Sequence, residues 1–563
     1  MKKSTSTALH WTYSFSKPYL WGVVLLALIG ASISGGFILL AVVSSAILDS
    51  ATGARDGGVW YWIGLLLIII VLQSLLHGVA SQVRARISGR MEMNLRQMLF
   101  STLNRKQYNQ LYAIHSGDIV NRLSSDVQVV VNGVVQLLPQ LISMSTKLIA
   151  GFIVLMNISP IFSLVIAGGG LVMYGSGRLY RLRYKTLHKK CQSTEGQTRS
   201  FIQECMENII VIKSFCKEHL IHQKLEERQQ ANYRAKLQRN MVTATATTSS
   251  YLMVSLGYFA VLAWGAFQLS AGAITFGALL AFLQIMEQIK APFRNMSGLT
   301  PQYYAMLASA ERLQELEQLQ DESTEANYVQ LEHVYTELKT IECDQLTFSY
   351  ESDPLTRYVF YNTQLTIHKG EFVGIAGASG SGKSTLLQLI LGLVQPGAGE
   401  ISLLLRNGSS VPGIVGRLLY AYVPQTNLMF SGTIRDNLTM FNVAVNDSDI
   451  EHALYIACLS EDITDFPDGL DTVLGERNIG LSEGQAQRLS IARAVISGAP
   501  ILLLDECTSA LNRELEKEVL HRLRLLKERT VIFVSHSVSA LIDCDRVIDL
   551  DRLKHRKEVG HGA

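Results

Sequence analysis

The chain has 563 residues, of which 17% are charged and 48% are hydrophobic, and its mean hydropathy is +0.20. It is too long for one hydrophobic core and too apolar for one soluble domain, so we expect at least two domains, one of them in lipid. The formal net charge of +2 excludes the strongly basic surface of a nucleic-acid-binding protein, and we expect no nucleic-acid partner.

Apolar segments recur through the first half of the chain. A bilayer core takes about 20 mostly apolar residues of helix, and the segments approach or exceed this length. They cover residues 20–48, 60–79, 134–156, 161–174, 251–269 and 274–289. The pattern predicts a membrane domain of six transmembrane helices embedded in a lipid bilayer.

Two long polar loops separate the second span from the third and the fourth from the fifth. Apolar residues recur at helical spacing through residues 91–111 and 201–215, so we expect the helices to extend far past the bilayer. The loops carry most of the basic residues: Arg84, Arg86, Arg90, Arg96, Arg105 and Lys106, then Arg178, Arg181, Arg183, Lys185, Lys189 and Lys190. The positive-inside rule therefore predicts that both loops, the N-terminus and the C-terminus are cytoplasmic.

The composition changes near residue 340. Short β-rich runs at 371–375, 418–423, 501–504 and 530–534 alternate with helical stretches, which is typical of a mostly parallel sheet flanked by helices. Between the halves, residues 306–320 have the pattern of a charged amphipathic helix. The expected organisation is a cytoplasmic N-terminus at 1–18, a membrane domain at 19–310, a linker at 311–339 and an α/β domain at 340–563.

A glycine-rich loop follows the predicted strand at 371–375 and precedes a helix, which is the context of a phosphate-binding loop. Its glycines let backbone N–H groups surround phosphates, and the helix N-terminus adds positive potential. The residues are Gly377, Ala378, Ser379, Gly380, Ser381, Gly382, Lys383, Ser384 and Thr385. Lys383 would reach the β- and γ-phosphates and Ser384 would bind Mg²⁺, whereas the alternative is an ordinary Gly/Ser-rich turn.

Two carboxylates end an apolar run. Residues 501–504 are all apolar, which indicates a strand buried on both faces, and Asp505 and Glu506 follow directly. At that end of a parallel sheet, Asp505 would hold Mg²⁺ and Glu506 would polarise an attacking water. Together with the upstream loop, the pair predicts an α/β P-loop ATPase domain.

In motif content and order the chain resembles the ATP-binding cassette (ABC) transporters, as an exporter-type half-transporter. Beyond the motifs above, Tyr350 resembles the adenine-stacking aromatic, Gln425 the Q-loop glutamine, Glu476 an acidic loop that touches the membrane domain, and His536 the switch histidine. Residues 481–485 resemble the signature sequence. Residues 117–126 and 207–215 resemble the coupling-helix regions.

The resemblance implies roles for these residues. Glu506, His536 and Gln425 would be catalytic, and Ser384, Gln425 and Asp505 would hold Mg²⁺. ATP would be bound by residues 377–385 with Tyr350, Gln425 and His536, and by Ser482, Gly484 and Gln485 across a dimer. The alternatives are an edge-strand aromatic at Tyr350, satisfied polar side chains at Gln425 and His536, and a solvated charge at Glu476.

The chain departs from the family at two positions near these motifs. Glu483 replaces the first glycine of the signature and brings a carboxylate near a phosphate, and Asn512 stands where the family commonly has Asp. The resemblance implies a second half-transporter as the partner. We favour a homodimer, in which both ATP sites contain the altered signature, over pairing with a different subunit.

Ionisable residues inside a membrane are costly and indicate a pathway, so Lys147 near the middle of the third span is a candidate cargo contact. His77 and Gln140 join it as candidates. The alternatives are snorkelling or helix pairing for Lys147 and interhelical hydrogen bonds for the other two.

The expected function is ATP-driven export of a small molecule, a lipid or a peptide by alternating access, and the expected location is the inner membrane of a bacterium. An importer built on the exporter fold and a nucleotide-gated channel or regulator are the alternatives. The motifs do not choose among cargoes, because one fold carries many.

Overall fold

The structure of this chain is a computed structural model that describes residues 2–55, 58–322, 331–350, 358–426, 428–475 and 480–555. The chain separates into two compact units. The helical unit contains Met1–Thr102 and Gly117–Gln318, and the sheet unit contains Leu103–Ser116 and Leu319–Ala563. The segment before residue 117 therefore belongs to the sheet unit, although long helices precede and follow it in the sequence.

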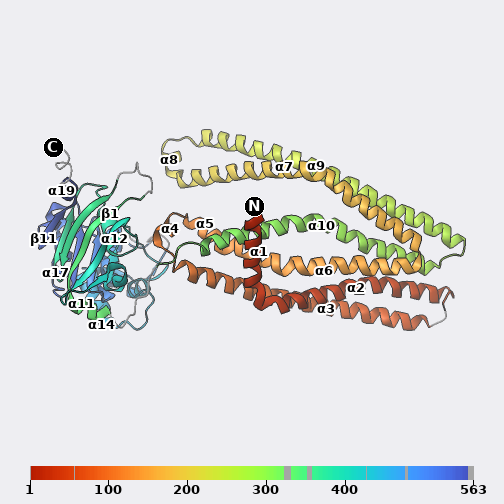
Figure 1. Cartoon of the computed structure of the whole chain (residues 1–563), viewed down its shortest axis with the longest axis horizontal. Helices are drawn as coiled ribbons and strands as arrows, with labels where there is room; N and C mark the ends of the chain where they lie inside the picture. Colours follow the sequence, from red (N-terminus) through yellow and green to blue (C-terminus); the bar gives the residue numbers. More distant parts are fainter. Residues whose placement is uncertain are drawn as a thin grey trace. The chain divides into compact units, whose positions relative to one another are not determined.

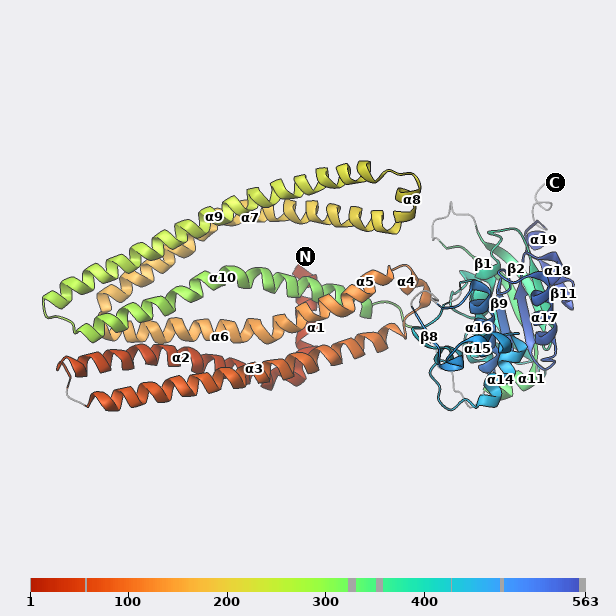
Figure 2. The same ribbon diagram turned by 180° about the vertical axis from the view of Figure 1, so that it is seen from behind.

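Long helices make up the helical unit (Figure 1). In chain order they and their short connections are α1 Lys2–Ser16, η1 Lys17–Tyr19, α2 Leu20–Ala51, α3 Val59–Leu103, α5 Ser116–Asn121, the π-helical turn η2 Arg122–Asp126, α6 Val127–Ile158, α7 Pro160–Glu207, α8 Ile209–Ser214, α9 Glu218–Ser270 and α10 Phe276–Glu317. Helices α7 and α9 run side by side, joined at one end through α8 (Figure 2), while α2, α6 and α10 contact one another.

Four segments of the described chain are long and apolar enough to cross a membrane: Thr7–Ala51, Val59–Leu103, Ser116–Ile158 and Glu218–Ser270. Helix α10 begins with a shorter apolar stretch, Phe276–Ile289. The predicted span at 161–174 lies within α7, where most side chains are outside the described set. The chain thus has a transmembrane helical domain.

A polar half follows the apolar half of α3, and it stays helical because it has a core of its own. Met91, Leu95 and Leu99 are fully buried and recur every fourth residue, so they share one face of the helix. They pack with Val127 of α6 and Leu313 of α10. The prediction that the first long loop is helical is thereby confirmed as far as residue 103.

That helix was expected to continue to residue 111, but it ends at Leu103. A separate short helix, α4, covers Tyr108–Tyr112. Between the two, Lys106 forms an isolated antiparallel β-bridge with Asp321. The backbone groups used in this pairing are unavailable for helical hydrogen bonds, which explains the interruption.

The predicted amphipathic helix at 306–320 is the end of α10, which runs without a break from Phe276 to Glu317. The helix therefore extends past residue 311, where the linker was expected to begin. Within the expected linker lies a short helix, α11 (Leu331–Glu337), and the first strand, β1 (Leu338–Phe348), begins just before the linker was expected to end.

The sheet unit has two main sheets. The five-stranded sheet has the order β11-β3-β10-β9-β6 with parallel pairing throughout, as predicted from the apolar runs. Its strands are β3 Phe372–Ala376, β6 Tyr420–Val423, β9 Ile501–Asp505, β10 Thr530–Val534 and β11 Arg546–Asp549. A four-stranded antiparallel sheet, which the sequence did not predict, has the order β2-β1-β4-β5 with β2 Phe360–His368, β4 Ala398–Leu405 and β5 Ser410–Pro412.

Helices surround the parallel sheet: α12 Lys383–Ile390, α13 Ile434–Thr439, α14 Asp447–Ile456, α15 Ser460–Asp465, α16 Glu483–Ile496, α17 Arg513–Arg524, α18 Val538–Leu541 and α19 Leu550–His555. Two-residue strands, β7 Gly432–Thr433 and β8 Val473–Leu474, form a small third sheet. The central strands β9 and β10 are buried along their whole length. Their carboxyl ends carry the predicted site residues.

Candidate nucleotide site

The glycine-rich loop connects β3 to α12, as its motif predicted. Gly377, Gly380 and Gly382 have φ values of 154°, 76° and 92°, which side-chain-bearing residues rarely adopt. A Cβ on Gly382 would also lie 2.6 Å from a methyl carbon of Val359. Both backbone conformation and space therefore require glycine in this loop.

Lys383 begins α12 and curls back into the loop. Its Nζ donates to the carbonyl oxygens of Gly377 and Ala378, both at 3.0 Å, and the residue is only 5% exposed. The ammonium thus lies inside the curve of the loop, where it can meet a phosphate that the backbone N–H groups surround.

Asp505, at the end of β9, provides a candidate position for a divalent cation. The residue is 1% exposed, and its Oδ1 has no hydrogen-bond partner among the described residues. Burial raises the pKa of this carboxyl, while hydrogen bonds from Ser384 and Tyr422 oppose the increase. An unpartnered buried oxygen beside a serine hydroxyl fits the hard oxygen ligands that Mg²⁺ prefers.

Tyr422 of β6 is a residue that sequence reasoning missed. Its hydroxyl donates to Asp505 Oδ2 at 3.2 Å. Burial and the neighbouring carboxylate raise the pKa of Tyr422, so the group stays protonated and remains a donor. Its position two residues before Pro424 gave no signal, because the contact depends on β6 pairing with β9.

The three predicted catalytic side chains meet. Glu506 Oε2 accepts a hydrogen bond from Gln425 Nε2 at 2.9 Å, and its Oε1 lies 2.7 Å from His536 Nε2. Glu506 has φ of 48°, a left-handed conformation that is costly for a residue with a side chain and that recurs at functional sites. The carboxylate is therefore held from two sides, immediately beyond Asp505.

Tyr350 lies next to the same loop. Its hydroxyl and Thr385 Oγ1 are 2.8 Å apart, and its ring meets that of Phe348 edge to face at 5.0 Å. Tyr350 as a whole is 66% exposed, so it is accessible to a planar ligand.

The predicted signature residues form the start of α16. Ser482 caps the helix, its hydroxyl accepting from Gln485 N, while Gln485 Oε1 accepts from Ser482 N in return. Gln485 Nε2 also donates to Asp462 at 2.8 Å. Among the described hydrogen bonds, none joins the signature to the glycine-rich loop of the same chain. Glu476 lies outside the described residues.

The two departures from the family pattern are compatible with this local structure. Glu483 is exposed in the first turn of α16, where a negative charge is favourable. Asn512 caps α17, its side chain accepting from Leu515 N at 2.8 Å, and Asn and Asp serve this role about equally well. Neither substitution disturbs the fold of the chain that carries it.

In the helical unit, Phe37 of α2 connects two of the predicted cargo residues. Lys147 Nζ lies 5.2 Å from the centre of the Phe37 ring, and the His77 ring centre lies 6.5 Å from it. No carboxylate among the described residues pairs with Lys147. Gln140 is exposed on α6, and no described hydrogen bond connects it with Lys147 or His77. Sequence reasoning did not single out Phe37, because an aromatic residue in an apolar span looks like an ordinary packing residue.

Comparison with known families identifies the chain. Residues 21–293 match the family model of the ABC transporter transmembrane region, and residues 360–509 match the family model described as ABC transporter. Together the two models cover more than half of the sequence. The chain belongs to the ABC transporters. It has the organisation of an exporter-type half-transporter, in which an ATPase domain drives export.

Known proteins agree with this assignment. An ABC transporter B family member 1 from Dictyostelium discoideum is 28% identical over 87% of this chain, which spans 54% of that protein. An ATP-dependent lipid A-core flippase from Syntrophus aciditrophicus (strain SB) is 26% identical over 93% of this chain and 86% of its own length. The structure of a bacterial Atm1-family ABC exporter with ATP bound has a TM-score of 0.77 at 20% identity, covering 97% of this chain and 99% of that one, which shows a common fold.

Proposed function

We propose that two copies of this chain form an exporter of amphipathic molecules that carry an acidic group, in the inner membrane of a bacterium, with both termini cytoplasmic. The choice of cargo rests on the surroundings of Lys147. This residue is a cation within an apolar helix, it lies beside the Phe37 ring, and no carboxylate among the described residues pairs with it. The basic residues of the two long loops support the orientation. A relative named as a lipid A-core flippase supports an amphipathic cargo.

The energy for transport comes from ATP hydrolysis. The loop at 377–385 and Lys383 bind the phosphates, and Tyr350 stacks on the adenine. Asp505 and Ser384, with Gln425, would hold Mg²⁺, which would neutralise phosphate charge when bound. Glu506 accepts a proton from the attacking water, and the hydrogen bond from Gln425 and the contact with His536 orient its carboxylate.

The second copy completes each ATP site. Ser482, Gly484 and Gln485 of one chain would meet the γ-phosphate held by the other chain's loop. Ser482 is exposed at the start of α16, where a second chain can reach it, which supports this arrangement. A homodimer is favoured because exposed Glu483 leaves α16 intact.

Glu483→Gly tests the homodimer. If identical chains form both sites, removing this carboxylate from the neighbourhood of a phosphate lowers the KM for ATP by about fivefold, since two like charges a few ångströms apart in a wet site repel by roughly 1 kcal/mol. ATPase rates of the purified protein in lipid nanodiscs, with mass determination, measure this. Glu461→Gln, another exposed carboxylate of the sheet unit, is the control. An unchanged KM would contradict the proposed trans contact of Glu483.

Lys147→Met tests the cargo class. In inside-out proteoliposomes, we expect the wild type to move fluorescently labelled phosphatidylglycerol in preference to labelled phosphatidylcholine. The variant should lose about tenfold in phosphatidylglycerol transport, because one charge-assisted contact is worth roughly 1.4 kcal/mol or more. Lys147→Arg should retain most of it.

Thr146→Val is the matched control, because the one hydrogen bond that the described residues show for the Thr146 hydroxyl stays within its own helix, at Ile142 O. Equal transport of both lipids by the wild type, or an unaffected Lys147→Met variant, would refute the acidic cargo. If neither the wild type nor any variant hydrolysed ATP, the proposal of an ATP-driven exporter would itself be refuted.

A further inference from the structure

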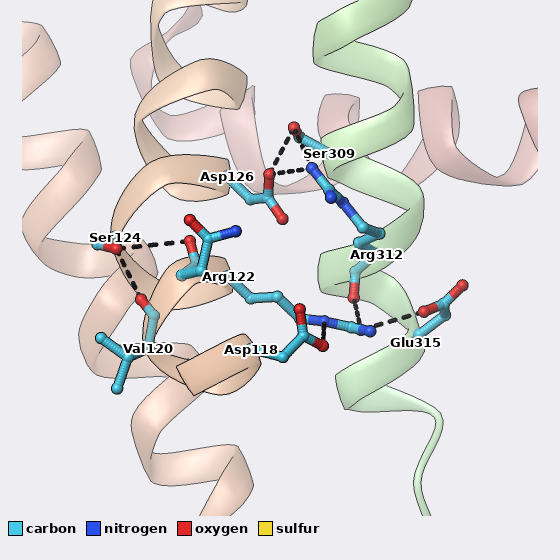
Figure 3. Close-up of polar contacts among 9 residues, drawn as sticks. Asp118, Val120, Arg122, Ser124, Asp126, Ser309, Arg312 and Glu315 are labelled. Atoms are coloured by element: carbon cyan, nitrogen blue, oxygen red, sulfur yellow. Dashed lines mark hydrogen bonds and ion pairs between the residues drawn. The ribbon is translucent and has the colours of Figure 1, made fainter. Parts of the chain in front are cut away.

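The chain passes from the sheet unit into the helical unit at Gly117 and back into the sheet unit after Gln318. Within the helical unit, residues next to these two passages are joined by a network of polar contacts between α5–η2 and the end of α10 (Figure 3). Residues more than 180 positions apart in sequence meet there. We call this network the clasp; its members are Asp118, Arg122, Asp126, Ser309, Arg312 and Glu315.

Arg122 makes the first connection. Its Nε donates to Asp118 on its own side at 2.9 Å, while its Nη1 donates across to Arg312 O at 2.8 Å and to Glu315 Oε2 at 3.0 Å. The Arg122 side chain is 14% exposed, but those of Asp118 and Glu315 are 41% and 62% exposed, so water reaches these ion pairs from the carboxylate side and screens them more than a buried pair. Arg122 therefore ties the backbone of α10 directly to η2.

Asp126 makes the second connection, from the end of the π-helical turn. It is 2% exposed, and its Oδ1 accepts from Ser309 Oγ at 2.8 Å and from the Arg312 guanidinium. Its Oδ2 is buried without a hydrogen-bond partner among the described residues. A buried carboxylate with one unsatisfied oxygen is costly, and π-turns recur at functional sites, so selection for stability alone does not explain this arrangement.

The sheet unit ties the same two passages together on its own side. Lys106, 5% exposed, donates to Leu319 O at 2.6 Å and pairs with Asp321 at 2.8 Å. Gln107 N donates to Gln320 O at 3.0 Å. The two connecting segments are thus fastened to each other both before and after they change units, and neither can shift alone without breaking these polar contacts.

We propose that Asp126 and Arg312 are positioning residues that couple the ATPase cycle to movement of the membrane helices. When nucleotide binding displaces the segment at 103–116, the clasp makes α6 and α10 follow as one body. The Oδ2 of Asp126, which has no partner among the described residues, can accept a hydrogen bond from the Arg312 guanidinium in a second arrangement. The contact between the two residues then persists while α6 and α10 move. This inference does not depend on which cargo is exported.

Hydrogen–deuterium exchange of the full-length protein in nanodiscs tests the inference, with and without ATP, Mg²⁺ and orthovanadate. In the wild type we expect these additions to slow exchange in the glycine-rich loop and to change it in α6 and α10. In Asp126→Asn and Arg312→Gln, the loop should respond as in the wild type, while the change in α6 and α10 should fall by at least half. Glu195→Gln, which breaks the exposed Lys236–Glu195 pair of the same unit, is the control and should respond as the wild type does.

Thermal stability separates coupling from folding. Arg312→Gln leaves a buried, unpaired carboxylate and should lower the Tm more than Asp126→Asn, because the Arg312 side chain is 46% exposed and its charge can be hydrated. The double variant should regain Tm relative to Arg312→Gln but not the response in α6 and α10. The inference would be overturned if Asp126→Asn kept the full change of exchange in α6 and α10, or if the size of that change followed Tm across the variants. Ser309→Ala replaces any variant that does not fold.

Discussion

Glu506→Gln should lower the ATPase rate by about 100-fold or more, the usual contribution of a general base, while leaving ATP binding intact. The amide retains the shape of the carboxylate and can still contact Gln425 and His536, which now hold the carboxylate at 2.9 Å and 2.7 Å. It cannot accept a proton from water. Phosphate release by the protein in nanodiscs measures the rate, and binding of a fluorescent ATP analogue measures the affinity.

Glu400→Gln provides the matched control for this variant. Glu400 is an exposed carboxylate on β4 of the same unit, so its neutralisation should change neither quantity. Hydrolysis by Glu506→Gln at the rate of the wild type would contradict the proposed role of Glu506. Loss of both binding and hydrolysis would instead assign Glu506 to holding the site together.

Lys383→Met should act one step earlier, on binding. The Lys383 ammonium lies inside the loop with two backbone carbonyls as its described acceptors, and a phosphate would provide a stronger, charged acceptor. Charge-assisted hydrogen bonds are worth about 1.5–3 kcal/mol, so we expect roughly a 10- to 100-fold loss of ATP affinity. Equilibrium binding of the fluorescent ATP analogue checks this directly.

Lys339→Met, at an exposed lysine of β1, controls for loss of a positive charge from the same unit. It should bind ATP as the wild type does. If Lys383→Met kept wild-type affinity and lost only turnover, the lysine would act on the transition state alone. The two variants at Lys383 and Glu506 thus separate binding from hydrolysis.

Much of the sheet unit could be predicted because its signals are local. The runs at 501–504 and 530–534 are apolar on both faces and form β9 and β10, the buried centre of the parallel sheet. The glycine-rich loop was recognisable because its conformation depends on its own glycines. The antiparallel sheet was not predicted, since β1 has an irregular burial pattern and register shifts that weaken period-two alternation.

The interruption after Leu103 illustrates the limit of helical periodicity. Residues 91–111 have a continuous helical pattern, yet Lys106 pairs with Asp321 and the helix stops. A local pattern carries no information about a partner that is distant in sequence, and here the partner decides the conformation.

The sequence by itself therefore determined the order of the two halves, the apolar helices, the phosphate loop and the pair Asp505–Glu506, because each depends on neighbours within a few residues. Only the tertiary structure decided that Glu506 lies between Gln425, 81 positions away, and His536. It likewise decided that Asp126 is buried against Arg312, 186 positions away. Such contacts arise from packing between elements, where burial and charge pairing outweigh the local preference of any one segment.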